Sequence, residues 1–237
     1  MGSPGLLDKT YNAIIRQMKG TGQAPHYTEL AVELGVSVEV ARNTLHELVS
    51  LGIPGIWLFP DTDYICSFAP FSNLPTQYRI TVDGEQKWFG QWGFESLAVC
   101  WLFPGKLVQI DAPCLDCGSA VHVEMRDGVV LKTNPEGIMG YVTVPLAKWM
   151  QRLPYAWSTM NLFRSEEHIR NWGRYDSAAE QGILPLESIV KVFSGIFFQR
   201  RLDSNYVSHA QQYFGETLSV LSEIAKKLPF WTPPEPQ

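Results

Sequence analysis

The sequence WFGQWGFESLAVCWLFPGKLVQIDAPCLDC (Trp88 to Cys117) decides the fold class, because a helical pattern gives way to a strand pattern within it. Residues 94–103 are mostly apolar and stop before Pro104-Gly105, which is typical of a buried helix ended by proline. Residues 107–110 then form a short apolar run of the kind found in strands. The stretch therefore predicts a buried helix that leads directly into a sheet.

Two dipeptides on either side of this stretch predict hairpins. Asp83-Gly84 ends the alternating residues 77–82, and Asp127-Gly128 separates the strand candidates 120–125 and 129–132. Both dipeptides favour the tight turns that join antiparallel strands. Further candidates are a strand at 142–144 and helices at 166–172, 186–200 and 207–227, the first of these capped by Ser165.

The N-terminal part is helical. Residues 6–20 have one apolar face, and residues 27–52 show a helix-turn-helix pattern with Thr28 and Ser37 as expected N-caps. Residues 56–68 would form the hairpin of a wing. We therefore expect an α+β fold: a winged-helix-like N-terminal subdomain (1–72), a core of a mixed β-sheet flanked by helices (73–231), and a flexible tail (232–237).

A helix-turn-helix pattern raises the question of DNA binding. The outward face of the second helix would present two acidic side chains among five polar ones, namely Glu39, Arg42, Asn43, His46 and Glu47. The net charge of the whole chain is −5, which opposes non-specific binding to a polyanion. Nucleic acid is thus disfavoured as a partner, and a packed helical subdomain is the preferred interpretation.

The composition is that of an ordinary globular protein, with 45% hydrophobic and 18% charged residues in 237. No apolar run has the length of a membrane span, and the first residues do not resemble a signal peptide. Four cysteines in a chain of this length do not indicate a disulfide scaffold, so we expect a cytoplasmic protein. A small molecule is the expected partner, and the sequence gives no oligomeric state.

Three segments together resemble the alkylmercury lyase (organomercurial lyase) family. They are LPTQYRITVDG (Leu74 to Gly84), the stretch from Trp88 to Cys117, and STMNLFRSEEHIRNW (Ser158 to Trp172). The resemblance extends from about Tyr27 to Phe230 and implies that family's core with a winged-helix-like N-terminal region. Family members that cleave carbon–mercury bonds use two cysteines, whose thiolates suit a soft metal, and an acid that protonates the departing carbon.

The family's catalytic positions are altered in this sequence. In an ungapped comparison from Trp92 to Cys114, the first cysteine falls on Gly93 and the acid on Ser96, and the second cysteine falls on or beside Trp157. Without two thiols at these positions, carbon–mercury cleavage by the family's mechanism is not expected.

Other polar groups near these positions are candidate ligand contacts. The predicted catalytic residue is Ser96, as a hydrogen-bonding or proton-relay group, and the predicted ligand-binding residues are Trp92, Gly93, Trp157, Ser158 and Thr159. Local capping and loop hydrogen bonds would equally account for Ser158 and Thr159. Glu95 adjoins Ser96 but points about 100° away from it on a helix, so the two need not share a cavity.

Cys114 and Cys117 form a Cys-x-x-Cys turn, which supplies two of the four ligands that a structural zinc site needs. His122 is the candidate for a further ligand that lies nearest in the sequence, whereas His168 is interpreted as part of a solvated charged helix face. A structural turn, a metal site and a redox pair are all compatible with the motif. The redox interpretation is the weakest, because a strand rather than a helix should follow. No cofactor is expected apart from a metal at Cys114 and Cys117.

Three functions follow. The first is a diverged lyase-like enzyme that carries out a lyase or elimination reaction on a small organic substrate. The second is a non-catalytic protein that holds a ligand or metal on the same scaffold. The third is a DNA-binding regulator that senses a ligand in its core.

Overall fold

The computed structural model describes residues 5–149, 151–152, 155–225 and 230. These residues form an α+β fold, as the sequence predicted. Among them, no helix combines the length and apolar character needed to cross a membrane. The predicted tail, 232–237, lies outside the described residues.

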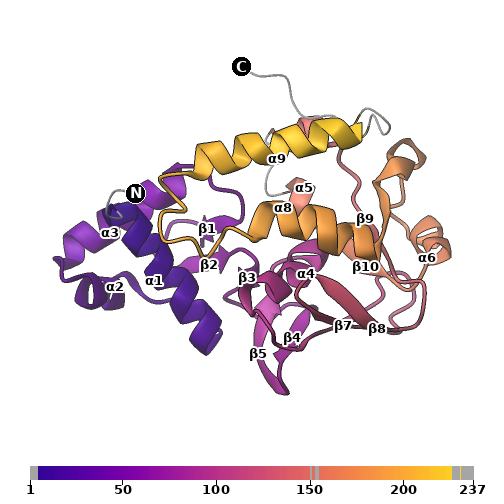
Figure 1. The fold of residues 1–237 in the computed structure, drawn as a ribbon, viewed down its shortest axis with the longest axis horizontal. Helices are drawn as coiled ribbons and strands as arrows, with labels where there is room; N and C mark the ends of the chain where they lie inside the picture. Colours follow the sequence, from indigo (N-terminus) through magenta and orange to yellow (C-terminus); the bar gives the residue numbers. More distant parts are fainter. Residues whose placement is uncertain (1–4, 150, 153–154, 226–229, 231–237) are drawn as a thin grey trace.

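The N-terminal part contains three helices, α1 (Leu6–Thr21), α2 (Tyr27–Leu34) and α3 (Val38–Ser50), at one end of the molecule in Figure 1. Ser37 caps α3 as predicted, by accepting a hydrogen bond from the Val40 amide at 3.2 Å. The predicted Thr28 cap is wrong. His26 caps α2 instead, because its ring accepts from the Thr28 amide while Glu29 accepts from the His26 amide in a capping box.

An eight-stranded sheet has the order β1-β2-β3-β5-β4-β6-β7-β8. Its strands are β1 (Ile56–Leu58), β2 (Ile65–Phe68), β3 (Phe71–Ser72), β4 (Arg79–Val82), β5 (Glu85–Gly90), β6 (Val108–Pro113), β7 (Ala120–Arg126) and β8 (Val129–Asn134). Every strand pair among the described residues is antiparallel, so the sheet is not mixed as predicted. The short connections β4–β5, β6–β7 and β7–β8 explain this, because parallel neighbours need long crossovers.

The predicted hairpin turns are present. Asp83 and Gly84 both have positive φ (46° and 86°) between β4 and β5, and Asp127 and Gly128 (49° and 76°) do so between β7 and β8. The expected wing, 56–68, contains the antiparallel pair β1 and β2. This pair belongs to the large sheet, because β3 joins β2 to β5. One sheet therefore runs through the predicted boundary at residues 72 and 73.

A second sheet has the order β10-β9-β11, from β10 (Asn161–Phe163), β9 (Met139–Tyr141) and β11 (Ile183–Pro185). The predicted strand at 142–144 is wrong, because the strand lies three residues earlier and is centred on Gly140. A Cβ at Gly140 would lie 2.2 Å from Ile189 Cδ1 and 2.5 Å from Phe94 Cε1. The strand passes so close to the core that only glycine fits.

The central helix is α4 (Gly93–Leu102), of which nearly every residue is buried. It packs between the large sheet, β10 and a continuous helical segment at 186–198 (Figure 1). That segment comprises α7 (Leu186–Ser188), the π-helix η3 (Ile189–Ser194) and α8 (Gly195–Phe198), and α9 (Ala210–Ala225) runs alongside it. The remaining helices are α5 (Tyr155–Ser158), α6 (Glu166–Asn171) and the 3₁₀ turns η1 (Leu146–Lys148) and η2 (Ser177–Gly182).

Candidate functional site

Gly93 is the first residue of α4, and its surroundings explain why it is glycine. Its amide donates a hydrogen bond to the Met160 carbonyl at 2.9 Å. A Cβ at this position would lie 2.8 Å from that same oxygen and 3.0 Å from both Asn161 Cα and the Tyr78 hydroxyl. Backbone therefore fills the space that a cysteine side chain would need.

Ser96 lies one turn further along α4 and is fully buried. Its hydroxyl donates to the Gly93 carbonyl at 2.7 Å, a bond within its own helix. A Cβ added at Gly90 would lie 2.4 Å from Ser96 Cβ, so the serine also packs tightly against β5. The hydroxyl proton is thus already engaged by the backbone.

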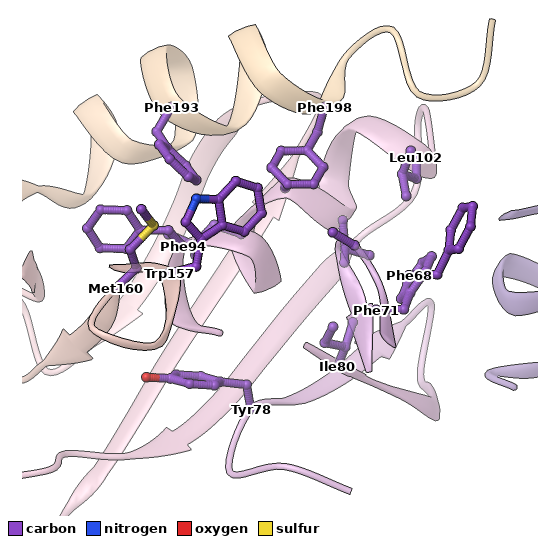
Figure 2. Close-up of a cluster of buried hydrophobic side chains, with 14 of the residues drawn as sticks. Phe68, Phe71, Tyr78, Ile80, Phe94, Leu102, Trp157, Met160, Phe193 and Phe198 are labelled. Atoms are coloured by element: carbon purple, nitrogen blue, oxygen red, sulfur yellow. The ribbon is translucent and has the colours of Figure 1, made fainter. Parts of the chain in front are cut away.

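Trp157, on or beside which the second family cysteine was expected to fall, is a core residue. It is 1% exposed, and its ring meets Trp57, Phe193 and Phe198 at centroid distances of 6.4, 6.4 and 6.5 Å. Figure 2 shows Phe193 and Phe198 pointing onto its indole from the helical segment above. The large ring fills the volume where a thiol would have faced a substrate.

The predicted contacts Ser158 and Thr159 lie elsewhere, in a polar pocket of about 220 Å³ that Arg152 and Arg174 also line. Both hydroxyls make local bonds. Ser158 donates to the Tyr155 carbonyl at 2.7 Å, and Thr159 donates to the Ala156 carbonyl at 2.8 Å. Of the predicted ligand-binding residues, Ser158 and Thr159 line this pocket, and their hydroxyl groups already make local hydrogen bonds.

Glu95 is the residue of α4 that the sequence argument passed over. Its side chain is fully buried, and neither carboxyl oxygen has a hydrogen-bond partner among the described residues. Burial raises the pKa of this carboxyl well above its usual range, and the opposing effects of its own amide and of the Arg201 charge are smaller. The raised pKa favours the protonated form of Glu95, which is the form that a general acid must have before it donates.

Two neighbours of Glu95 in sequence also bury polar atoms without partners among the described residues, namely Gln91 Oε1 and Trp92 Nε1. Such atoms are uncommon in folded proteins and mark places where a ligand or water completes the hydrogen bonding. A Cβ built at Gly55 would lie 3.1 Å from Gln91 Oε1 and 3.2 Å from Trp157 Cζ3. The unpartnered amide oxygen of Gln91 thus lies beside the Trp157 ring.

The positive charge of Arg201 acts to lower the pKa of Glu95, and the Arg201 side chain is itself buried, at 1% exposed. Its guanidinium donates to Pro54 O at 3.0 Å and to the Tyr11 hydroxyl at 3.3 Å, and no ion pair of Arg201 occurs among the described residues. It lines a mostly apolar pocket of about 200 Å³ between residues 51–54, α8 and α9. Arg201 therefore lines the pocket under α9 and also acts on the carboxyl of Glu95 through its charge, whereas Glu95 itself does not line that pocket.

A sequence signal for Glu95 did exist. It is the one charged residue in the otherwise apolar run 94–103. An acidic side chain inside a buried helix is costly unless it is neutral or paired, so its position was informative by itself. Arg201 carried no comparable signal, because its burial depends on residues 11 and 54, far away in the chain.

A second cluster involves both cysteines of the Cys-x-x-Cys turn. The sulfurs of Cys114 and Cys117 and a ring nitrogen of His168 all lie within 4.8 Å of one another. Hydrogen bonds from Ser119, and then from Cys114, lower the pKa of the Cys117 thiol.

The two histidines differ in their contacts. His122, the predicted further ligand, is hydrogen-bonded to Asp111 at 2.8 Å and to Glu124 at 3.1 Å, so both of its ring nitrogens are engaged. His168 is partly exposed on a helix with charged neighbours, as predicted, but its Nδ1 also lies 2.7 Å from Asp116 in the cysteine turn. The strand β7 follows the turn, as the argument against a redox pair expected.

The other thiols are not activated. Cys100 is fully buried in α4, and burial raises its pKa to about 12. Cys66 lies on β2, where burial also raises its pKa.

Comparison with known proteins agrees with this scaffold. The family model for alkylmercury lyase matches residues 71–197, more than half of the chain, and the chain therefore belongs to the alkylmercury lyase family. A crystal structure of the mercury-bound form of MerB2 is similar in fold, with a TM-score of 0.62 at 22% sequence identity, covering 83% of this chain and 98% of that chain. The comparison with curated proteins found no match. An alkylmercury-lyase-related function follows from the family.

Proposed function

We propose that this protein is a diverged enzyme of the alkylmercury lyase family that transfers a proton to a small organic substrate in a lyase or elimination reaction. Glu95 would be the proton donor. The observation that carries the proposal is the buried carboxyl of Glu95, which has no hydrogen-bond partner among the described residues and lies one residue from the position of the family's acid.

The substrate class follows from the pocket under α9. Its mostly apolar wall suits a small hydrophobic body, and its volume of about 200 Å³ limits that body to a few carbon atoms. Arg201 at its edge is a buried guanidinium without a carboxylate partner among the described residues, and such a group favours an anionic ligand. A small apolar carboxylate with a leaving group therefore fits best.

The family's two-thiol chemistry would not operate at Gly93 and Trp157, because backbone and indole occupy those places. An acid whose raised pKa favours the protonated form is nonetheless suited to protonate a departing group, and the carboxylate left behind would take up the proton that the substrate loses as its double bond forms. A proton held in a dry site has little competition from water, and general acids of this kind contribute roughly 10²–10⁴-fold.

The test uses a panel of small carboxylates with leaving groups, together with phenylmercuric acetate, incubated in D₂O and followed by NMR for turnover and deuterium incorporation. Glu95→Gln keeps the shape of the side chain but has no acidic proton, so turnover should fall roughly 10²-fold or more. Ser96→Ala, assayed in parallel, tests the relay role predicted for that serine. Undiminished turnover by Glu95→Gln would refute the proposal.

A DNA-binding role has less support. Asp63 is hydrogen-bonded to both Arg42 (2.9 Å) and His46 (2.5 Å), which lie on the exposed face of α3, so these two side chains are already engaged. The same face carries Glu39 and Glu47. The non-catalytic alternative, a metal-binding protein, is favoured by the cysteine cluster and is argued next.

A further inference from the structure

The Cys114–Cys117 turn and α6 meet although they are about 50 residues apart in the sequence. The turn closes through two backbone hydrogen bonds, from the Cys114 amide to Ser119 O and from the Gly118 amide to Cys114 O, both at 2.8 Å. Gly118 has φ of +72°, which a residue with a side chain rarely adopts. Both sulfurs are thereby held on one side of a rigid loop between β6 and β7.

Separate contacts bring His168 to this loop. Ser165 caps α6 by accepting from the His168 amide at 3.4 Å, and Arg164 donates to the Ala120 carbonyl at the start of β7, at 3.3 Å. The segment before α6 is thus tied to the strand that follows the cysteine turn. The imidazole then reaches Asp116, inside the turn, at 2.7 Å.

We propose that Cys114, Cys117 and His168 bind a borderline or soft divalent cation, Zn²⁺ foremost, as three protein ligands with a fourth position open. Two sulfurs and one imidazole nitrogen are the donor set that such cations prefer over Mg²⁺ or Ca²⁺. Ligand atoms around tetrahedral Zn²⁺ stand roughly 3.5–3.8 Å apart, as bond lengths of about 2.0–2.3 Å require. The present spread of at most 4.8 Å would need to contract by about 1 Å.

Asp116 acts as a positioning residue. Because His168 Nδ1 is hydrogen-bonded to Asp116, Nε2 is the ring nitrogen left with a lone pair for a metal. Carboxylate–histidine–metal arrangements of this kind fix the tautomer and orient the ring. Asp116 is one of the two residues that lie between the cysteines.

The open fourth position follows from exposure. Cys114 is 1% exposed, whereas Cys117 is exposed and His168 is partly so. A bound cation would therefore face solvent on one side and could accept water, a thiol or another soft ligand there. This site uses neither Glu95 nor the residues at the family's cysteine positions, so it does not depend on the proposed function.

The first experiment needs no variant. Protein purified under reducing conditions without chelators should contain about one equivalent of zinc by mass spectrometry, and the apoprotein should take up Co²⁺ with thiolate charge-transfer absorption and the intense d–d bands of tetrahedral cobalt. Absence of both the zinc and the charge-transfer bands would overturn the proposal, whatever the variants do.

Variants then assign the ligands, with Zn²⁺ affinity measured by competition against a chromogenic chelator. Cys117→Ser and His168→Ala should each abolish tight binding, and Asp116→Asn should weaken it about 10–100-fold. Cys66→Ser is the matched control, a partly buried free cysteine outside the cluster that should leave affinity unchanged. Binding by His168→Ala as tight as that of Cys66→Ser would remove the third ligand and overturn the site as proposed.

Discussion

The Gly93 amide and the Met160 carbonyl are hydrogen-bonded at 2.9 Å, and the carbonyl oxygen occupies the space into which a side chain at Gly93, the expected position of the family's first cysteine, would project. This hydrogen bond joins the start of α4 to the residue before β10. Met160 and Asn161 therefore leave no room for a side chain at Gly93, and a cysteine placed there would not fit without a shift of the backbone.

Gly93→Cys should consequently destabilise the protein by about 1–3 kcal/mol, the usual cost of overpacking, rather than create a mercury-cleaving enzyme. Urea unfolding measures the change. Gly173→Cys is the matched control, because a Cβ there meets nothing within 4 Å. Equal free energies of unfolding for the two variants would show that the backbone around Met160 moves to accommodate the new side chain without a cost in stability.

Carbon–mercury cleavage by the wild type is expected to be absent or slow, since no thiol pair lies at Gly93 and Trp157. The assay is release of ionic mercury from phenylmercuric acetate in the presence of excess thiol. Sustained release that survives Cys117→Ser would mean that α4 supports the reaction without sulfur ligands. Release that disappears in Cys117→Ser would place the chemistry at the cysteine turn.

Glu95 should make stability fall as pH rises. Its folded-state pKa is raised, so between the unfolded value near 4.5 and the folded value the native state holds a proton that the unfolded state has lost. Native stability then decreases through this window, and Glu95→Gln, which cannot ionise, should lack the decrease. Its melting temperature should exceed that of the wild type by more at pH 8 than at pH 5.

The control for this comparison is Glu136→Gln, which removes an exposed acid in the turn after β8. Its melting temperature should follow the wild type at every pH. A constant difference between Glu95→Gln and the wild type across the range would show that Glu95 ionises in the native protein much as it does in the unfolded chain.

Tyr78 should contribute to stability through its hydroxyl, which donates to Asn161 Oδ1 at 2.9 Å inside the core. Tyr78→Phe leaves that buried amide oxygen without its partner, at a cost of about 1–3 kcal/mol. Tyr64→Phe removes a hydroxyl from a ring that is 59% exposed and should cost under about 0.5 kcal/mol. Chemical denaturation of both variants tests the difference.

The elements that sequence alone predicted are those with local causes. The Asp83-Gly84 and Asp127-Gly128 turns, the Ser37 and Ser165 caps and the end of α4 before Pro104 depend on residues adjacent in the chain. The strand around Gly140 was misplaced because its position is set by Ile189 and Phe94, which are distant in sequence.

The candidate site was less predictable for the same reason. The family frame located α4 and the cysteine turn, but the argument passed over Glu95 on helical geometry alone and assigned His168 to a solvated face. Only the folded chain shows that the Glu95 carboxyl has no hydrogen-bond partner among the residues that the structure describes, and that α6 reaches the turn about 50 residues earlier.

The pairing of β3 with β5 has a consequence for any attempt to divide the protein. A fragment that began at residue 73 would leave the edge of β5 unpaired, with its amide and carbonyl groups open to association with other chains. The N-terminal part is thus continuous with the rest of the molecule through β3, and a cut at that junction would expose an unpaired strand edge.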